Sequence, residues 1–202
     1  MNYKSETTKT YDTFPDEFEE KFKSYLQDYL RTEVDEFLKH LPPKGKILDV
    51  GSGAGNQALY FKNLGYEVVC IDLSKEMIRK CIEKGLNAFL MDFEEINLPE
   101  RSFDGVWSYT SLLHSPKSKM QEILKQILIV LKPNGVFFLG MKQGVGADFK
   151  VQEKYPGTKR YFSHYLDDEL KELLTPMFNL IFSSKTKLRE TNVYLNYVLT
   201  KK

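Results

Sequence analysis

The chain has 202 residues, of which 42% are hydrophobic and 28% are charged, and this composition is typical of one folded domain rather than of a disordered polymer. Its 29 basic and 28 acidic side chains give a formal net charge of +1, so the whole molecule lacks the field that draws proteins to nucleic acids or anionic lipids. No apolar run is long enough to cross a bilayer, and residues 1–10 lack the hydrophobic stretch of a signal peptide. Nucleic-acid and membrane partners are therefore disfavoured.

Cysteine usage points to a reducing compartment, and histidine spacing does not indicate a metal site. Cys70 and Cys81 are the only cysteines, too few for a disulfide framework. His40, His114 and His164 lie far apart and form no cluster with metal-ligand spacing. We therefore expect a cytoplasmic protein without a metal site. No repeat or linker divides the sequence, which predicts a single domain, as a monomer or a homodimer.

The N-terminal part is predicted to be helical. Apolar residues recur in steps of three and four over residues 15–41, which is typical of an amphipathic helix or a helix pair. Pro42 and Pro43 end this pattern. We expect residues 1–43 to form a helical cap.

Short apolar runs and helical patterns alternate over residues 44–142. Parallel strands need a covering connection, so this alternation predicts a doubly wound α/β fold that forms the core. The expected strands are 46–50, 66–71, 88–91, 103–109 and 136–141, and the expected helices are 56–64, one capped by Ser74 and ended by Gly85, and 120–131.

The C-terminal part breaks the alternation. After a helix at 166–174, strand-like runs at 177–183 and 193–200 have only a polar stretch between them. Without room for a covering helix, they should form an antiparallel pair at one edge of the sheet. The irregular segment 143–165 is long enough to serve as a substrate loop or lid.

A glycine cluster follows the first expected strand. In an open α/β sheet, ligands bind beyond the carboxyl ends of the strands, where strand order reverses. Gly51, Gly53 and Gly55 would let the backbone approach a ligand there, beside the free amides of the next helix. A dinucleotide fingerprint would need glycine where Asn56 stands, which disfavours a nicotinamide oxidoreductase.

Three aspartates stand at neighbouring strand ends. Asp72 follows Gly51 by 21 residues, the placement at which a carboxylate can accept both hydroxyls of a ribose. Asp92 can accept a hydrogen bond from an adenine amine, and Asp49 can brace the glycine loop by accepting its amides. Three carboxylates around one pocket favour a cationic ligand over a polyphosphate.

Five ordered motifs resemble those of class I S-adenosylmethionine-dependent methyltransferases. They are ILDVGSGAG at 47–55, CIDLS at 70–74, FLMDF at 89–93, FDGVWSYTSLLH at 103–114 and LKPNGVFF at 131–138. Their order and spacing make the match far more specific than one glycine motif. The resemblance implies a Rossmann-like, seven-stranded fold, S-adenosylmethionine as cofactor and S-adenosylhomocysteine as product.

The same resemblance implies contacts to each part of the cofactor. The three glycines would pass under its methionine part, and Asp72 would hold the ribose. Asp92 and the amide of Phe93 would read the adenine, with Leu73 and Met77 packed on its faces. The remaining expected cofactor contacts are Tyr11, Asp49, Ser52 and Ser108.

The acceptor side is expected beyond the fourth strand. His114 is the candidate general base, because the pKa of histidine is naturally near neutrality. Tyr109 would orient the acceptor or face the sulfonium with its ring. Lys142 and Arg160 would bind a carboxylate or phosphate on the acceptor. From these residues we expect in-line methyl transfer to a small molecule. We expect this molecule to be acidic if Lys142 and Arg160 bind it.

Two other functions stay open alongside the oxidoreductase. One is methylation of RNA or protein. The near-zero net charge disfavours RNA as the substrate but does not bear on protein. The other is a non-catalytic adenosyl-binding sensor or partner subunit, because methyl transfer requires no invariant catalytic side chain.

Overall fold

The computed structural model describes residues 2–189 and 192–202. Seven strands form one sheet in the order β3-β2-β1-β4-β5-β9-β8. The strands are β1 (Lys46–Val50), β2 (Glu67–Asp72), β3 (Asn87–Leu90), β4 (Phe103–Tyr109), β5 (Leu131–Lys142), β8 (Phe178–Arg189) and β9 (Asn192–Lys201). The first five are parallel, and β9 runs antiparallel to both β5 and β8. The expected doubly wound fold with an antiparallel C-terminal pair is confirmed.

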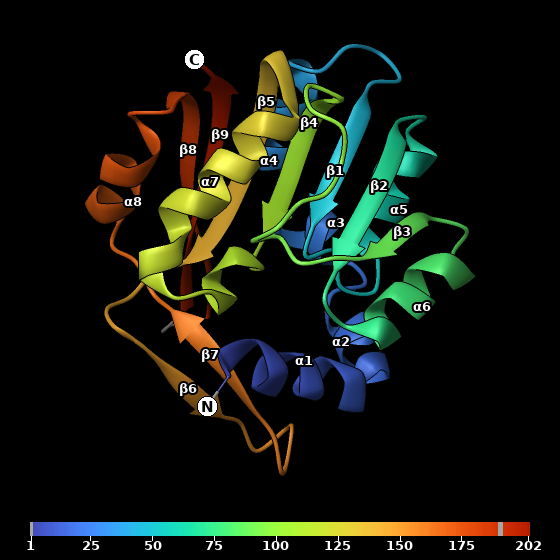
Figure 1. Ribbon diagram of the computed structural model, residues 1–202, viewed down its shortest axis with the longest axis vertical. Coiled ribbons are helices and arrows are strands. Elements are labelled where there is room, and N and C mark those ends of the chain that lie inside the picture. The colour runs from blue at the N-terminus through green and yellow to red at the C-terminus, as the bar shows by residue number, and fades with distance from the viewer. Residues whose placement is uncertain (1, 190–191) are drawn as a thin grey trace.

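Helices cover both faces of the sheet (Figure 1). On one face lie α7 (Met120–Val130) and α8 (Asp167–Leu174); on the other lie α4 (Arg31–Lys39) and α5 (Asn56–Asn63). Because side chains alternate along a strand, Val106 packs into the first core and its neighbour Trp107 into the second. The Trp107 ring stacks on Phe138 with centroids 3.7 Å apart. This rigid centre fixes where the strand ends lie.

The N-terminal cap differs from the expected helix or helix pair. Residues 15–41 form three short helices, α2 (Pro15–Lys21), α3 (Tyr25–Tyr29) and α4, and an unexpected helix, α1 (Tyr3–Thr13), precedes them. Asn2 caps α1 by accepting from the amide of Lys4 at 3.0 Å. The hydrophobic pattern hides α1 because its buried residues are threonines, Thr7 and Thr10.

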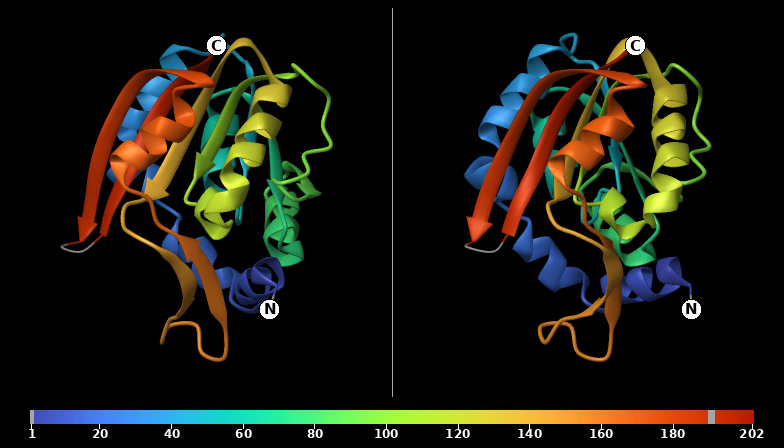
Figure 2. Two further views of the ribbon diagram at one scale, coloured as in Figure 1. Left: turned by 60° about the vertical axis from the view of Figure 1, so that its left-hand side comes forward. Right: turned by 90° about the vertical axis from the view of Figure 1, so that its left-hand side faces the viewer.

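The segment 143–165 is an ordered hairpin rather than an irregular loop. Its strands are β6 (Ala147–Val151) and β7 (Lys159–Ser163), paired antiparallel. In both side views the hairpin extends below the sheet beside α1 (Figure 2). Thr10 Oγ1 donates to the carbonyl of Lys159 at 3.0 Å, and the amide of Tyr161 donates to Thr7 Oγ1 at 3.0 Å. The buried threonines thus join α1 to β7.

Strand β8 is longer than expected, because it includes most of the polar stretch 184–192 that we interpreted as a connector. Ser184 and Thr186 face a buried carboxylate, Glu33 of α4, and both donate to its Oε1, as does Asn196 of β9 at 3.2 Å. These polar side chains are therefore internal contacts between α4 and the sheet.

The remaining helices are α6 (Lys75–Glu83) and two 3-10 turns, η1 (Leu112–His114) and η2 (Lys117–Lys119). Ser74 caps α6 as expected, accepting from the amide of Met77 at 3.2 Å. None of the helices within residues 2–189 and 192–202 has the length and apolar character needed to cross a membrane.

Candidate functional site

A pocket lies at the carboxyl ends of the parallel strands, with α1 beneath these ends in Figure 1. The core contributes the glycine loop and the ends of β2 and β4, and the cap contributes α1 and α2. Ten of the predicted site residues line this pocket: Tyr11, Gly51, Ser52, Gly53, Asp72, Leu73, Met77, Phe93, Tyr109 and His114. Six others, Asp49, Gly55, Asp92, Ser108, Lys142 and Arg160, are absent from its wall.

The glycine loop turns sharply between β1 and α5. Gly51, Gly53 and Gly55 have φ values of +69°, +52° and +75°, which side chains rarely adopt. A Cβ on Gly51 would lie 2.2 Å from Cβ of Ser111, whereas a Cβ on Gly53 would meet nothing within 4 Å. Gly51 therefore serves close packing, and Gly53 leaves a bare backbone surface facing the pocket.

Asp72 braces this loop. Its Oδ2 accepts from the amide of Gly53 at 2.9 Å, and its Oδ1 accepts from the amide of Ser74 at 2.9 Å. Burial raises the pKa of this carboxyl, and the amide hydrogen bonds oppose the rise. A carboxylate oxygen can accept more than one hydrogen bond, so Asp72 keeps capacity for ribose hydroxyls.

Asp49 does not brace the loop, contrary to the prediction. Its side chain is buried at the end of β1, and its Oδ2 has no hydrogen-bond partner among the described residues. Burial, followed by the charge of Asp72, raises the pKa of Asp49 to about 8. An unpaired carboxyl oxygen beside a second carboxyl offers hydrogen-bond acceptors that suit a cationic ligand, and S-adenosylmethionine carries both a sulfonium and an ammonium.

Asp92 is held by α1. Lys4 Nζ lies 2.6 Å from its Oδ2 and 2.8 Å from Oε2 of Glu94, and the amide of Glu94 donates to its Oδ1 at 2.9 Å. Phe93, the next residue, lines the pocket. The ion pair with Lys4 therefore competes with the expected contact between Asp92 and adenine.

Tyr11 and His114 form a hydrogen-bonded pair whose polarity follows from their partners. Nδ1 of His114 lies 2.6 Å from the carbonyl of Tyr161, which can only accept, so Nδ1 carries the proton. Nε2 therefore accepts from the Tyr11 hydroxyl at 2.9 Å. That hydroxyl in turn accepts from Nη1 of Arg160 at 2.9 Å.

This environment contradicts the premise for His114 as a general base. Burial, then the charge of Arg160, lowers its pKa to about 3, while the bond to Tyr161 opposes the shift. Both ring nitrogens are already hydrogen-bonded. We therefore interpret His114 as a neutral wall residue that orients Tyr11.

Arg160 lies behind the pocket wall rather than in it. Its side chain is buried, and its guanidinium carbon lies 4.9–5.3 Å from the ring centroids of Tyr11, Phe18, Tyr155 and Phe162. Lys142, half-buried at the end of β5, has a lowered pKa because of burial and the nearby Arg160. The two cations lie close enough to influence each other.

Ser108 and Tyr109 end β4 in different ways. Ser108 is fully buried, and its hydroxyl shares a hydrogen bond with Ser111 at 2.7 Å, so it supports the loop from below. Tyr109 lines the pocket, and its ring fits only because residue 140 is glycine: a Cβ there would lie 2.2 Å from a Tyr109 ring carbon.

Several wall residues escaped the sequence analysis. Helix α1 contributes Tyr3, Lys4, Thr7 and Thr8, α2 with its C-cap contributes Phe18 and Phe22, and α5 contributes Asn56 and Gln57. Among these residues, the two phenylalanines had a sequence signal, as members of the apolar pattern over residues 15–41 that predicted a helix or helix pair.

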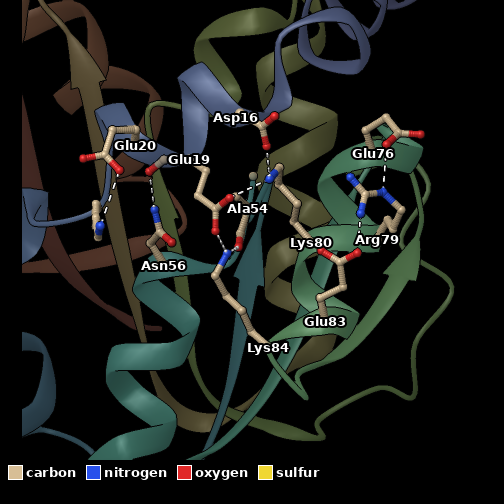
Figure 3. Close-up of polar contacts among 12 residues, drawn as sticks. Asp16, Glu19, Glu20, Ala54, Asn56, Glu76, Arg79, Lys80, Glu83 and Lys84 are labelled. Carbon is tan, nitrogen blue, oxygen red and sulfur yellow. Dashed lines mark hydrogen bonds and ion pairs between the residues drawn. The ribbon is translucent and has the colours of Figure 1, made fainter.

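Ion pairs fasten the cap to the core, as Figure 3 shows. Lys80 of α6 lies 2.5 Å from Asp16 and 2.6 Å from Glu19 of α2. Lys84 bonds the same Glu19 and also the carbonyl of Ala54 in the glycine loop, at 2.6 Å for the latter. Through Lys80 and Lys84, these contacts connect α2 to the glycine loop, and both α2 and the loop line the pocket.

The strand order with its antiparallel β9, the glycine loop and the acidic strand ends together define a class I S-adenosylmethionine-dependent methyltransferase domain. The family described as "Methyltransferase domain" matches residues 48–139. Residues 48–139 thus match the domain family that the sequence motifs resemble, and S-adenosylmethionine is the cofactor of class I methyltransferases of this family.

Individual relatives agree with this class. The chain is 34% identical over 123 residues to YqeM of Bacillus subtilis, whose name describes a methyltransferase, covering 57% of this chain and 48% of the relative. It is 34% identical over 109 residues to sarcosine/dimethylglycine N-methyltransferase of Aphanothece halophytica, covering 50% and 39%. The chain therefore spans about half or less of the length of these curated relatives.

A solved structure matches over the whole chain. The 1,6-didemethyltoxoflavin-N1-methyltransferase of Burkholderia thailandensis, with its substrate and S-adenosylhomocysteine bound, aligns with a TM-score of 0.74 and 20% identity. The alignment covers 100% of this chain and 92% of the other. At this identity the likeness establishes the fold.

Proposed function

We propose that this protein transfers a methyl group from S-adenosylmethionine to a small acidic molecule. The observation that carries the proposal is the pair of buried Asp49 and half-buried Asp72 beside the bare backbone of Gly53, because that combination suits a cationic nucleoside ligand. Leu73, Met77 and Phe93 supply apolar surface for the flat base at the same end of the pocket.

When bound, S-adenosylmethionine supplies an electrophilic methyl group, so the protein must mainly align the acceptor and exclude water. The cap residues Tyr11, Phe18 and Phe22 line the pocket together with the glycine loop. Tyr109 stands at the end of β4, where it would orient the acceptor. Alignment of this kind can lower a barrier by about 7–11 kcal/mol.

An acidic acceptor is supported by the charge of Arg160, which lies directly behind Tyr11 of the pocket wall. The described contacts of Arg160 are a hydroxyl, an amide and four rings, none of which neutralises its charge. Arg160 and Lys21 both contribute to lowering the pKa of His114, which lines the pocket. A positive field of this kind favours a carboxylate or phosphate. The named substrates of the Aphanothece relative, sarcosine and dimethylglycine, carry carboxylates.

Action on RNA or protein, and a non-catalytic sensor, remain the competing functions. A cytoplasmic location and a monomeric or dimeric state also belong to the proposal. So does the division of one domain into a cap (1–43), a core (44–142), a substrate loop or lid formed by the hairpin segment (143–165) and a C-terminal part (166–202).

A panel of acceptors tests the proposal. Purified protein, labelled S-adenosylmethionine and small carboxylic and phosphoric acids should give methylated product, with the matching neutral amides and esters as controls. Faster turnover of the neutral compounds would overturn the acidic-acceptor part. Tight cofactor binding without turnover of any small molecule, RNA or protein would favour the sensor.

A further inference from the structure

The hairpin of β6 and β7 has one covered edge and one open edge. Strand β7 packs against α1 and lies between α1 and β6 in the left view of Figure 2. Within residues 2–189 and 192–202, β6 pairs with β7 only. Four of the five residues of β6 are exposed, among them Val151 at 74%. An open strand edge of this kind is a template for pairing with another chain.

The backbone bonds of β7 show which residues of β6 face the open edge. The amide of Tyr161 donates to Thr7 Oγ1 at 3.0 Å, and its carbonyl lies 2.6 Å from Nδ1 of His114. Both backbone groups of Tyr161 therefore point away from β6. In an antiparallel ladder such a residue belongs to a pair without mutual hydrogen bonds, so its partner Phe149 points its own N–H and C=O toward the open edge.

Three alternate residues present their backbone groups along this edge. Ala147 and Val151 have the orientation of Phe149, because each stands two residues from it in an unshifted ladder. The amide of Phe149 is bonded at 2.7 Å to Oδ1 of the preceding residue, Asp148. A partner strand would replace this local bond with a ladder bond and would free the Asp148 carboxylate for another contact.

The side chains of β6 are self-complementary about Phe149. When a second copy of β6 pairs antiparallel with Phe149 opposite its own counterpart, Asp148 of each copy lies opposite Lys150 of the other. Ala147 of each copy then lies opposite Val151. Asp148 and Lys150 share one face of the strand, because side chains alternate, and the twofold axis repeats their contact. Cross-strand pairs of opposite charge stabilise a sheet, whereas like charges destabilise it.

From this symmetry we infer that β6 is a dimer interface, which pairs antiparallel with β6 of a second copy so that the two hairpins form one continuous sheet. An edge of five residues is smaller than a standard interface, so the dimer should be weak and should form as the protein concentration rises. The inference decides between the monomer and the homodimer that the proposed function leaves open, and it holds whatever the methyl acceptor is.

Charge reversal tests the pairing, with sedimentation velocity over about 1–500 µM protein as the readout. Wild-type protein should pass from monomer to dimer over this range. Asp148→Lys and Lys150→Asp each place like charges opposite each other twice, so each variant alone should dimerise about tenfold or more weakly. An equal mixture of the two variants should form the dimer again, because every lysine then faces an aspartate of the other protein.

Glu122→Lys is the matched control, because it makes the charge change of Asp148→Lys at an exposed position of α7. It should leave the dimer unchanged. A wild type that stays monomeric, single variants that dimerise like the wild type, or a mixture that stays monomeric would each overturn the pairing. Calorimetry with S-adenosylhomocysteine on the same proteins measures the cofactor site separately, so a monomer that binds this ligand leaves the proposed function standing.

Discussion

The Tyr11 hydroxyl donates to Nε2 of His114 at 2.9 Å, which joins the cap to the end of the core strands. Because Nδ1 of the same ring is bonded to Tyr161 in the hairpin, one imidazole contacts all three parts that enclose the pocket. The pair thus couples the position of α1 to that of β7.

His114 should not titrate near neutrality. Its pKa of about 3 predicts that the Cε1 proton resonance, followed by NMR, stays constant from pH 8 to below pH 5. Arg160→Met removes the neighbouring charge and should raise that pKa. A wild-type midpoint near 6.5 would show that His114 is free to act as a base after all.

Activity gives an independent check on the same residue. Loss of a general base costs about 10²- to 10⁴-fold in rate, whereas loss of a wall residue should cost less. We therefore expect His114→Gln to retain turnover within about tenfold and to keep the wild-type pH profile between pH 6 and 8.

Tyr11→Phe leaves Arg160 and His114 without their shared partner. This variant should lower the free energy of unfolding by about 1–3 kcal/mol, which is more than we expect for His114→Gln.

Asp49 should make the apoprotein less stable as pH rises. Its folded pKa of about 8 lies above the usual aspartate value, so its stabilising contribution is complete at acid pH and is lost as pH rises toward and through about 8. Asp49→Asn should flatten this slope. Thermal melts of both proteins between pH 5 and 8.5 measure the difference, and parallel curves would contradict the assignment.

The same carboxyl predicts a proton released on ligand binding. A ligand ammonium near Asp49 favours its charged form, so binding of S-adenosylhomocysteine at pH 7 should release close to one proton. Calorimetry in buffers of different ionisation enthalpy measures this number. Asp49→Asn should abolish most of the release, whereas an unchanged value would place the proton elsewhere.

Glu19 should control closure of the cap. Lys80 and Lys84 lower the pKa of Glu19, so its contribution to stability is present above its usual pKa and is lost as pH falls through the lowered value. Glu19→Gln should cost about 1 kcal/mol, because the side chain is 30% exposed and solvent weakens the pairs. Limited proteolysis should then cut within residues 1–43 sooner, and cofactor affinity should fall.

Glu83→Gln is the control for Glu19, because Glu83 pairs with Arg79 on the exposed side of α6 (Figure 3). That variant should leave both the cleavage rate and the affinity unchanged. If Glu19→Gln behaves like Glu83→Gln, the ion pairs do not hold the cap.

The core of the fold was predictable because its signals are local. The apolar run at β1, the glycines after it and the aspartate at the end of β2 specify a strand, a turn and a strand end within 27 residues, from Lys46 to Asp72. The antiparallel end was predictable because no helix fits between β8 and β9. Strand boundaries were less predictable, because β8 extends through Ser184 and Thr186, whose hydroxyls bond Glu33 and Asn196.

The part of the pocket wall that α1 forms was not predictable in the same way. Helix α1 buries Thr7 and Thr10, whose partners are 154 and 149 residues away, and no local pattern encodes such contacts. Asp72 rather than Asp49 braces the glycine loop for a similar reason: which carboxylate meets the amide of Gly53 depends on the path of the loop. The pKa of His114 likewise depends on Arg160, which lies 46 residues further along the chain.

The most direct test is calorimetry of S-adenosylhomocysteine binding to the wild-type protein, Asp72→Asn and Asp104→Asn. Asp104 accepts from the amide of Lys46 at 2.8 Å and from Lys132 at 2.9 Å, so it controls for loss of a structural carboxylate outside the pocket. We predict one-to-one binding to the wild type, a loss of about 10- to 100-fold in Asp72→Asn, and a change within about twofold in Asp104→Asn. No binding to the wild type, or equal affinity for all three proteins, would contradict the account.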